Sequence, residues 1–270
     1  MKPPPFDYHA PASLEEALQL KAKLGPDASV LAGGQSLVPM LNMRLARPSA
    51  LIDLNRIEAL AGVDASNGSV RVGAMTRHRA LERSEEAYRV CPLLREALTL
   101  VAHTIVRNRG TIGGSIAHAD PAAELPSVLV ALGGTVTVAS AGNERTIPAE
   151  DFFTFHFTTA LADDEILTAV TFPGLPSGSG YAFDEVSRRH GDYALAGAAC
   201  VIRDGTTRLA FLGVGPRPIL VESDDPAVAA AAVEPASDVH ATADYRRELV
   251  ATLAERTLET ARSRVEEGTR

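Results

Sequence analysis

The 270-residue sequence has no tryptophan, only two cysteines and no long apolar run. Cys91 and Cys200 stand far apart, so the chain cannot supply the four thiolates of an iron–sulfur cluster, and we expect both to be buried apolar residues. No stretch reaches the ~18 apolar residues of a membrane span. The segment Met1–Pro11 has neither the apolar core of a signal peptide nor an Arg-rich transit pattern, which predicts a cytoplasmic protein.

Positive charge is also in short supply. The chain has 26 Lys and Arg against 34 Asp and Glu, a net charge of −8. This balance disfavours a large contact with a phosphate backbone, so we expect no nucleic-acid partner. Hydrophobic residues make up 46% and charged residues 22%, which excludes a disordered, collagen-like or coiled-coil chain.

The order of apolar patterns and turn signals predicts an α+β protein with two domains. The predicted boundary is the Gly-, Pro- and Ser-rich segment 173–180, which separates residues 1–175, with subparts 1–60 and 61–175, from residues 176–270. We expect residues 103–120 to be irregular. The expected helices are 14–24, 37–45, 77–84, 92–102, 122–132, 225–232 and 244–266, and the expected strands are 29–32, 50–54, 70–72, 135–139, 165–172, 181–187, 194–203 and 208–214.

Two short segments share a pair of glycines followed by a polar residue. They are Ala32-Gly33-Gly34-Gln35-Ser36 and Thr111-Ile112-Gly113-Gly114-Ser115. Paired glycines permit positive φ and close approach of a ligand, and consecutive N–H groups can form an anion-binding nest. Neither segment is a Walker loop or a Rossmann fingerprint. One such segment is most simply an ordinary turn, whereas two could hold both halves of a diphosphate, and both interpretations stay open.

Three other interpretations compete for the residues after the second segment. Ser115 with His118 and Asp120 resembles a hydrolase set, but Ser115 lacks the Gly-x-Ser-x-Gly elbow. A metal site would use side chains without a recognised spacing, namely His103, His118, Asp120 and Glu124. We favour the third interpretation, in which Asp120 caps a helix that begins near Ala122.

Two further signals are weaker. Arg107 and Arg109 are expected to be ion-paired or solvated, with contact to a phosphate or a partner as the alternative. Tyr193 follows Gly191-Asp192 and precedes an apolar strand. From the residues alone, a half-buried aromatic residue after a turn is favoured over a ring packed on a planar cofactor.

Taken together, the motifs resemble the FAD-binding medium subunit of molybdenum hydroxylases. The likeness is to the carbon monoxide dehydrogenase medium subunit and the flavin domain of xanthine dehydrogenase, and it covers nearly the whole chain. It rests on both Gly-Gly segments in their contexts and on further segments in the expected order. These are Leu37-Val38-Pro39-Met40, Arg44-Leu45-Ala46-Arg47-Pro48, Ile52-Asp53-Leu54, Ile105–Gly110, His118–Pro121, Asp164–Leu167, Gly191–Ala194 and Tyr245–Leu249.

The resemblance implies a two-part FAD-binding domain of the vanillyl-alcohol oxidase type, followed by a small antiparallel sheet with helices. It assigns both Gly-Gly segments to the FAD diphosphate. It also places Asp120, Glu124 and Leu167 at the cofactor, Tyr193 near the isoalloxazine ring, and Val101 close by. No catalytic residue and no metal ligand is implied.

Two positions depart from the resemblance. Relatives often carry Asn where this chain has Ser115, which keeps hydrogen-bonding capacity with a shorter reach. Many relatives carry Lys where this chain has Glu185, so no cofactor role is assigned to that reversed charge.

The implied function is electron transfer. A molybdopterin-containing large subunit would hydroxylate the substrate. FAD would receive the electrons from a [2Fe-2S] small subunit and deliver them to an external acceptor. One alternative is a self-sufficient FAD oxidase or reductase with a base such as His156, His190 or Tyr193. Another is a non-catalytic assembly subunit with a structural nucleotide. The substrate and the acceptor are not encoded visibly.

Overall fold

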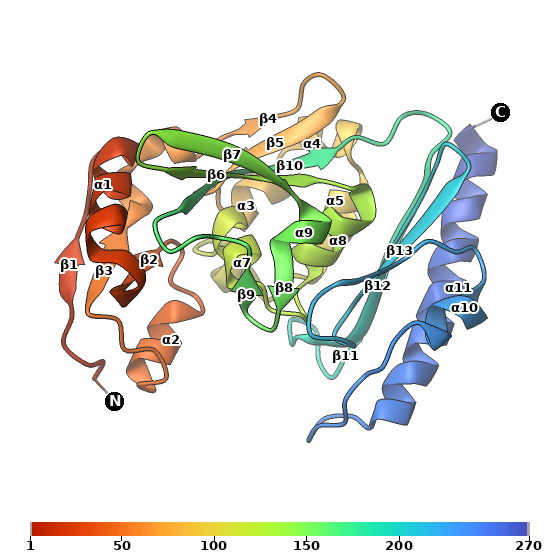
Figure 1. The fold of residues 1–270 in the computed structure, drawn as a ribbon. Helices are drawn as coiled ribbons and strands as arrows, with labels where there is room; N and C mark the ends of the chain where they lie inside the picture. The colour runs from red at the N-terminus through yellow and green to blue at the C-terminus, as the bar shows by residue number, and fades with distance from the viewer. Residues whose placement is uncertain (1, 269–270) are drawn as a thin grey trace.

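The computed structural model describes residues 2–268 and arranges them in three units (Figure 1). A unit with a small sheet lies at one end, a larger sheet with helices lies in the middle, and a third sheet backed by a long helix lies at the other end. The chain is therefore α+β, as the sequence predicts. Across residues 2–268, no helix combines the length and hydropathy needed to cross a membrane.

The N-terminal unit is a small parallel sheet with one helix packed on it. Its elements are β1 (Asp7–His9), α1 (Leu14–Leu24), β2 (Ala28–Leu31), α2 (Leu37–Asn42) and β3 (Ala50–Asp53), with 3-10 turns at Gly25–Asp27, Leu54–Arg56 and Glu58–Leu60. The strand order is β1-β3-β2. Ser13 caps α1, because its Oγ accepts a hydrogen bond from the N–H of Glu16 at 3.2 Å. β1 has no counterpart among the predicted strands, since three residues are too few for a periodic pattern.

The central unit is an antiparallel sheet covered by helices. Its elements are β4 (Val63–Asp64), β5 (Ser69–Gly73), α3 (His78–Glu82), α4 (Glu85–Val90), α5 (Leu93–Leu100), α6 (Thr104–Arg107), α7 (Ile112–His118), α8 (Glu124–Leu132), β6 (Thr135–Ser140), β7 (Asn143–Pro148), α9 (Ala149–Phe152), β8 (Phe153–Phe155), β9 (Thr158–Thr159) and β10 (Ile166–Pro173). The main sheet has the order β4-β5-β10-β6-β7, and β8 pairs with β9 in a separate hairpin. Helices α3, α5, α7 and α8 lie on one side of this sheet (Figure 1).

The prediction that residues 103–120 are irregular is wrong. This stretch contains α6 and α7, and the second Gly-Gly pair lies inside α7. Glycine has low helix propensity, which favours an irregular prediction. Tertiary packing overrides it: a Cβ at Gly113 would lie 2.5 Å from the Cβ of Ala74, so only glycine lets α7 pack this closely on the chain after β5.

The C-terminal unit is an antiparallel sheet with its two helices on one face and the central unit on the other. Its elements are β11 (Gly180–Ser187), β12 (Ala194–Arg203), β13 (Thr206–Leu212), β14 (Ile219–Val221), α10 (Pro226–Ala231) and α11 (Ala243–Gly268), with the strands in sequential order. Side chains of β12 alternate between two cores. Ala199 and Val201 pack with the central unit, whereas Ala198 and Cys200 pack beneath α11. Cys200 and Cys91 are both free and buried, which confirms that prediction.

Arg208 on β13 links the C-terminal sheet to α8. Its guanidinium donates hydrogen bonds to the carbonyl oxygens of Val130 and Ala131, each at 3.0 Å. These carbonyls belong to the last turn of α8, where that of Val130 also accepts from the N–H of the C-cap residue Gly133. The C-terminal unit thus supplies hydrogen-bond donors to the C-terminal end of α8.

Candidate functional site

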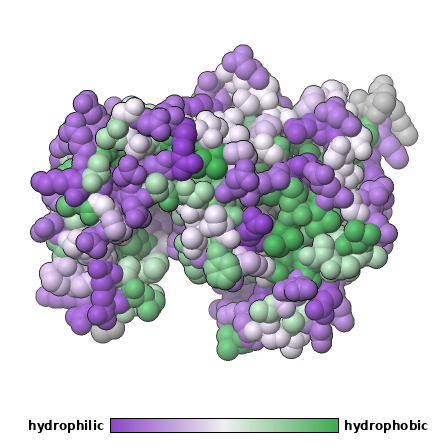
Figure 2. Space-filling view, viewed as in Figure 1, coloured by the Kyte–Doolittle hydropathy of each residue, from purple (hydrophilic) through white to green (hydrophobic). Residues whose placement is uncertain are grey.

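A cavity of about 630 Å³ lies between the N-terminal and central units. Its volume is in the range of ~300–1,000 Å³ that is typical of sites for small molecules and cofactors. The walls come from β2 and the segment after it, from α7, from the start of β10 and from the loop before β12. Figure 2 shows the surface hollowed between the N-terminal unit and the rest of the molecule.

Thirteen of the fourteen residues that the sequence places at a cofactor line this one cavity. Ile112 does not, because its side chain is fully buried in the main core. Val101 lines the cavity as well. The lining residues among the fourteen are Ala32, Gly33, Gly34, Gln35, Ser36, Thr111, Gly113, Gly114, Ser115, Asp120, Glu124, Leu167 and Tyr193. Segments far apart in the chain thus meet at one site, and contact of these residues with FAD stays a prediction.

The first Gly-Gly segment offers free backbone donors. Within residues 2–268, the N–H groups of Gly33, Gly34, Gln35 and Ser36 have no acceptor in the protein. Gly34 has φ of 73°, a conformation that glycine adopts without the penalty of a Cβ. Gly33 is needed for another reason: a Cβ there would meet the carbonyl oxygen of Arg109 and the Cα of Gly110. This segment has the form of the predicted nest for an anion.

The second Gly-Gly segment contributes differently from the prediction. The N–H groups of residues 112–115 all donate within the protein, to Thr76, Ala74, the Oγ1 of Thr111 and the carbonyl of Thr111, respectively. Neither Gly113 nor Gly114 has positive φ. These four positions therefore offer no free N–H for a nest, and contact of the segment with the FAD diphosphate stays a prediction. The glycines instead keep the wall thin, since a Cβ at Gly114 would lie 2.6 Å from the Oγ1 of Thr111.

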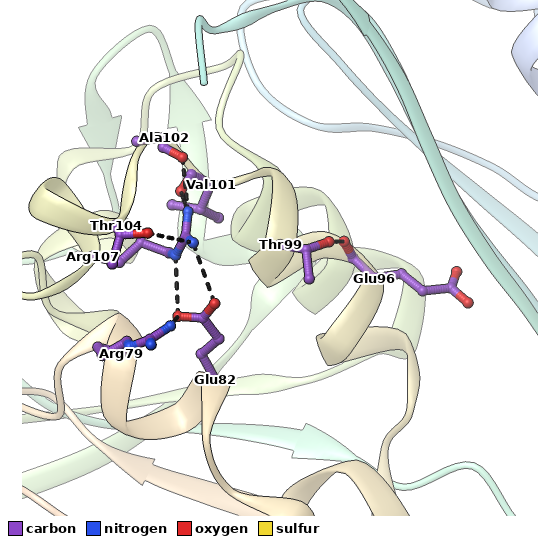
Figure 3. A network of polar contacts seen from close by, with 8 residues as sticks. All are labelled: Arg79, Glu82, Glu96, Thr99, Val101, Ala102, Thr104 and Arg107. Carbon is purple, nitrogen blue, oxygen red and sulfur yellow. Dashed lines mark hydrogen bonds and ion pairs between the residues drawn. The ribbon is translucent and has the colours of Figure 1, made fainter. Parts of the chain in front are cut away.

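Arg107 is ion-paired and cannot neutralise a phosphate. It is 7% exposed, and all five of its N–H donors are used within the chain (Figure 3). The acceptors are both carboxylate oxygens of Glu82, each at 3.2 Å, the carbonyls of Val101 and Ala102, each at 2.8 Å, and the Oγ1 of Thr104 at 3.3 Å. The prediction of ion pairing is confirmed for Arg107, and its role is to hold α6 against α3 and the end of α5.

Asp120 and Tyr193 lie together at the cavity. Tyr193 is 56% exposed at its mouth. Partial removal of its hydroxyl from water, then the negative charges of Asp120 and Glu124, raise the pKa of Tyr193 to about 12. Tyr193 is therefore protonated at neutral pH.

The predicted cap at Asp120 is wrong in detail. Asp120 Oδ1 accepts a hydrogen bond from the N–H of Ala122 at 2.9 Å, but α8 begins only at Glu124, after Ala123. Asp120 therefore stabilises the turn between α7 and α8 instead of capping α8. Its carboxylate stays beside the cavity.

Two carboxyl groups near the site are protonated more readily than usual. Burial raises the pKa of Glu124, which lines the cavity, to about 7. Burial, followed by the charges of Glu124 and Asp184, raises the pKa of Glu185 to about 8. Glu185 Oε2 is buried without a hydrogen-bond partner. The Glu185 carboxyl is therefore largely uncharged at neutral pH, so the position carries little of the negative charge that would replace the lysine of relatives.

The metal interpretation is wrong: among residues 2–268, no three His, Cys, Asp or Glu side chains are grouped so that they could hold a metal ion. His103 instead packs against Gly191 and His190. The hydrolase interpretation also has no support, since within the described part of the chain no hydrogen bond joins His118 to Ser115 or to Asp120. His118 packs its ring on Phe157, 5.1 Å between centroids.

His78 belongs to no sequence motif and is a further residue at the cavity. Its imidazole lines the cavity and is 5% exposed. A single histidine without a motif carries no sequence signal for a binding site. Only the fold reveals that this ring lies beside the second Gly-Gly segment.

The cavity has the size and the free backbone donors of a site for an anionic cofactor, and comparison with known proteins identifies the cofactor as FAD. Residues 4–175 match the family described as the FAD binding domain in molybdopterin dehydrogenase. The chain belongs to this family. Its fold is the two-part FAD-binding domain of the vanillyl-alcohol oxidase type, followed by the C-terminal antiparallel sheet.

Relatives match along almost the whole chain. The 6-hydroxypseudooxynicotine dehydrogenase complex subunit alpha of Paenarthrobacter nicotinovorans is 46% identical, covering 96% of this chain and 95% of that protein. The carbon monoxide dehydrogenase medium chain of Hydrogenophaga pseudoflava is 38% identical, covering 98% of this chain and 99% of that protein. A solved structure of carbon monoxide dehydrogenase from the same organism has a TM-score of 0.94, with 38% identity and coverage of 98% and 99% of the two chains.

The cavity fits FAD on its own geometry. Free N–H groups in the first Gly-Gly segment suit an anionic diphosphate. Glycines in both segments leave space that a Cβ would fill. Apolar residues in the walls, such as Leu54, Met75 and Val101, suit a flat ring system.

Proposed function

We propose that this chain is the FAD-containing electron-transfer subunit of a molybdenum hydroxylase complex, located in the cytoplasm. Electrons would come from a [2Fe-2S] small subunit and go to an external acceptor, while a molybdopterin-containing large subunit oxidises the substrate. The observation that carries the proposal is the convergence of both Gly-Gly segments and Tyr193 on one cavity, in a chain of this family. Two similar proteins named above are themselves subunits or chains of dehydrogenases.

The residues of this chain hold and tune the cofactor. The free N–H groups of Gly33–Ser36 would bind the diphosphate, and Tyr193 and Val101 would pack near the isoalloxazine. FAD itself supplies the two-electron chemistry when bound. Tyr193 supplies a protonated hydroxyl at neutral pH, so it is a hydrogen-bond donor and a poor general base.

Part of the surface near the cavity suits the small subunit. Met43 is 54% exposed and Leu45 is 71% exposed, and both lie in the segment that follows α2. Ile105 on α6 is also strongly exposed. Arg107, which lies in the same region, is buried and cannot take part. We propose that Met43, Leu45 and Ile105 contact the small subunit.

The test is anaerobic mixing of the complex and of the isolated FAD-loaded chain with the substrate of the complex. The flavin absorbance should bleach in the assembled complex and stay unchanged in the isolated chain. Rapid bleaching of the isolated chain would instead establish a self-sufficient enzyme. A flavin that never bleaches in an active complex would establish a structural nucleotide.

A further inference from the structure

The backbone of Arg77 is fixed beside the start of the second Gly-Gly segment. Arg77 is the N-cap residue of α3, and it pairs with Thr111 in a single antiparallel bridge. The next residue, His78, donates its backbone N–H to the carbonyl oxygen of Gly110 at 3.0 Å. The main chain of Arg77 thus belongs to the central unit and moves with the wall that the second segment forms.

The side chain of Arg77 reaches across to the N-terminal unit. One nitrogen of its guanidinium donates a hydrogen bond to Asn55 Oδ1 at 2.6 Å, and another donates to the carbonyl oxygen of Arg109. Asn55 lies in the 3-10 turn after β3, and its Nδ2 donates to the carbonyl oxygen of Ala32 at 2.9 Å. Ala32 begins the first Gly-Gly segment. We call this chain of hydrogen bonds from Ala32 through Asn55 and Arg77 to Arg109 the Arg77–Asn55 bridge.

Asp53 fixes the orientation of the Asn55 amide. Its Oδ1 accepts from the backbone N–H of Asn55 at 2.9 Å and from Nδ2 at 2.5 Å, while its Oδ2 accepts from the hydroxyl of Tyr8 at 2.5 Å. Since Nδ2 of Asn55 binds two acceptors, Oδ1 is left to accept from Arg77. Tyr8 lies on β1, so the bridge is anchored in the N-terminal sheet.

The bridge lies where the two walls of the cavity come closest. Arg109, whose carbonyl oxygen Arg77 binds, lies against Gly33, because a Cβ at Gly33 would meet that same oxygen. Apolar side chains such as Ile52 and Met75 also pack between the units. Apolar packing has no direction, whereas a hydrogen bond fixes both distance and angle. The bridge therefore constrains how Gly33 sits against the central unit.

Arg77 acts on the site through its neighbours. Neither Arg77 nor Asn55 lines the cavity, so neither side chain is placed to touch FAD. Within residues 2–268, Arg77 forms no ion pair, and both groups that it binds are uncharged. A planar guanidinium holds two acceptors in a fixed geometry, which suits a spacer between two segments better than it suits neutralisation of a charge.

We propose that Arg77 is a positioning residue for FAD, whose guanidinium, braced by Asn55, holds the first Gly-Gly segment at the separation from the second that the cofactor requires. This inference depends on FAD as the cofactor and is independent of the electron-transfer role. Because the two side chains complete one chain of hydrogen bonds, they act together.

The first test is a double-mutant cycle on FAD affinity in the full-length chain. Arg77→Met keeps an apolar stem without the guanidinium, and Asn55→Ala removes its acceptor. Each should weaken FAD binding about tenfold, the scale of one hydrogen bond to a charged group. The double variant should lose little more than either single variant, because both break the same bridge. Arg247→Met is the control, since Arg247 is exposed on α11 and pairs with Asp244 outside the cavity.

A distance measurement separates positioning from a general loss of stability. Spin labels at Glu15→Cys on α1 and Glu86→Cys on α4, both exposed, report the separation of the two units, while Cys91 and Cys200 are buried and stay unlabelled. In FAD-free Arg77→Met, the distance distribution from pulsed electron paramagnetic resonance should be broader than in the parent, and FAD should narrow it. A purely structural contact would lower stability and leave the distribution of the folded chain unchanged.

Three results would overturn the proposal: an unchanged distance distribution, a single variant that binds FAD as tightly as the parent, or additive losses in the double variant. If Arg77→Met does not fold, Asn55→Ala decides by the same affinity and distance measurements, because Asn55 is exposed and its truncation leaves no cavity in the core. A parent that binds no FAD would refute the cofactor itself, a result distinct from each of these.

Discussion

Gly34 shows how one backbone conformation prepares the site. Its φ of 73° turns the chain so that the next N–H groups stay free of partners in the protein. An L-residue in this conformation costs ~1–2 kcal/mol. The requirement for glycine here comes from the backbone angle, whereas at Gly33 and Gly113 it comes from close packing.

Gly34→Ala is expected to weaken FAD binding, because the methyl group moves the segment out of positive φ and displaces its donors. Gly205→Ala is a matched control, since Gly205 has φ of 75° in the turn between β12 and β13, outside the cavity. Both variants should lose ~1 kcal/mol of unfolding free energy, measured by urea denaturation without FAD. Only Gly34→Ala should lose affinity in a flavin titration; unchanged affinity would show that the segment is an ordinary turn.

Glu185 predicts a pH dependence of stability. Its pKa is about 8 in the folded chain, against ~4.3 for an unfolded glutamate. Between these values the unfolded chain releases the proton that the folded chain keeps, so stability is full below ~pH 4.3 and falls as pH rises to about 8. Glu185→Gln should remove this loss. The gain in unfolding free energy of the variant over the parent should be larger at pH 8 than at pH 5.5 by on the order of 2 kcal/mol.

Urea denaturation at pH 5.5 and pH 8 measures the effect of Glu185→Gln. Glu144→Gln is the control, because Glu144 is exposed on β7. If Glu185→Gln keeps the slope of the parent, the carboxyl is ionised in the folded chain and the prediction fails.

At the scale of elements, α3 and α6 are held together by charge. Glu82 at the end of α3 binds Arg107 at the end of α6, and both side chains are mostly buried. This pair fixes the start of α3, with His78, relative to Gly110 and the second Gly-Gly segment. The cavity wall therefore depends on an ion pair that does not itself line the cavity.

Glu82→Gln should destabilise the chain by ~3 kcal/mol, because it leaves the buried charge of Arg107 without a counterion. Glu85→Gln removes the exposed partner of Arg95 and should cost less than ~1 kcal/mol. Thermal and urea unfolding of the two variants provide the comparison. Similar small losses of unfolding free energy in the two variants would mean that Arg107 is as well solvated as a surface arginine.

At the scale of the whole molecule, the central and C-terminal units share one core. Ala199, Val201 and Leu212 of the C-terminal sheet pack in the same cluster as Leu98 of α5 and Leu129 of α8. Glu96 on α5 reinforces this contact, accepting from the N–H of Phe183 at 2.9 Å and pairing with Arg264 at 2.7 Å. The family match ends at residue 175, and the domain boundary there stays a prediction.

A chain truncated after residue 175 should not remain a well-folded monomer. It would expose the apolar faces of α5 and α8 and would leave the carbonyls of Val130 and Ala131 without Arg208. Size-exclusion chromatography should show aggregation, and thermal unfolding should lose its cooperativity. A monomeric fragment with a sharp transition would show that the first two units are independent of the third.

The sequence alone determined the fold class, the family and thirteen of the residues that line the cavity. The fold class follows from local patterns, namely helix caps and apolar periodicity. The family follows from the glycine pairs in their contexts, and only the resemblance to it placed Asp120, Glu124 and Leu167 at the cofactor. Ser13 at the start of α1 is an example, since its cap depends only on residues three positions away.

Tertiary structure alone decided how several of these residues act. Residues 112–115 look like a nest in sequence, but their N–H groups bond to residues 74, 76 and 111, and Gly113 is required by contact with Ala74. Ile112 turns into the core, Arg107 is neutralised by Glu82, and His78 reaches the cavity without a motif. Each outcome depends on which distant segment lies alongside, and local sequence does not encode that, because the partners are brought together only when the units pack.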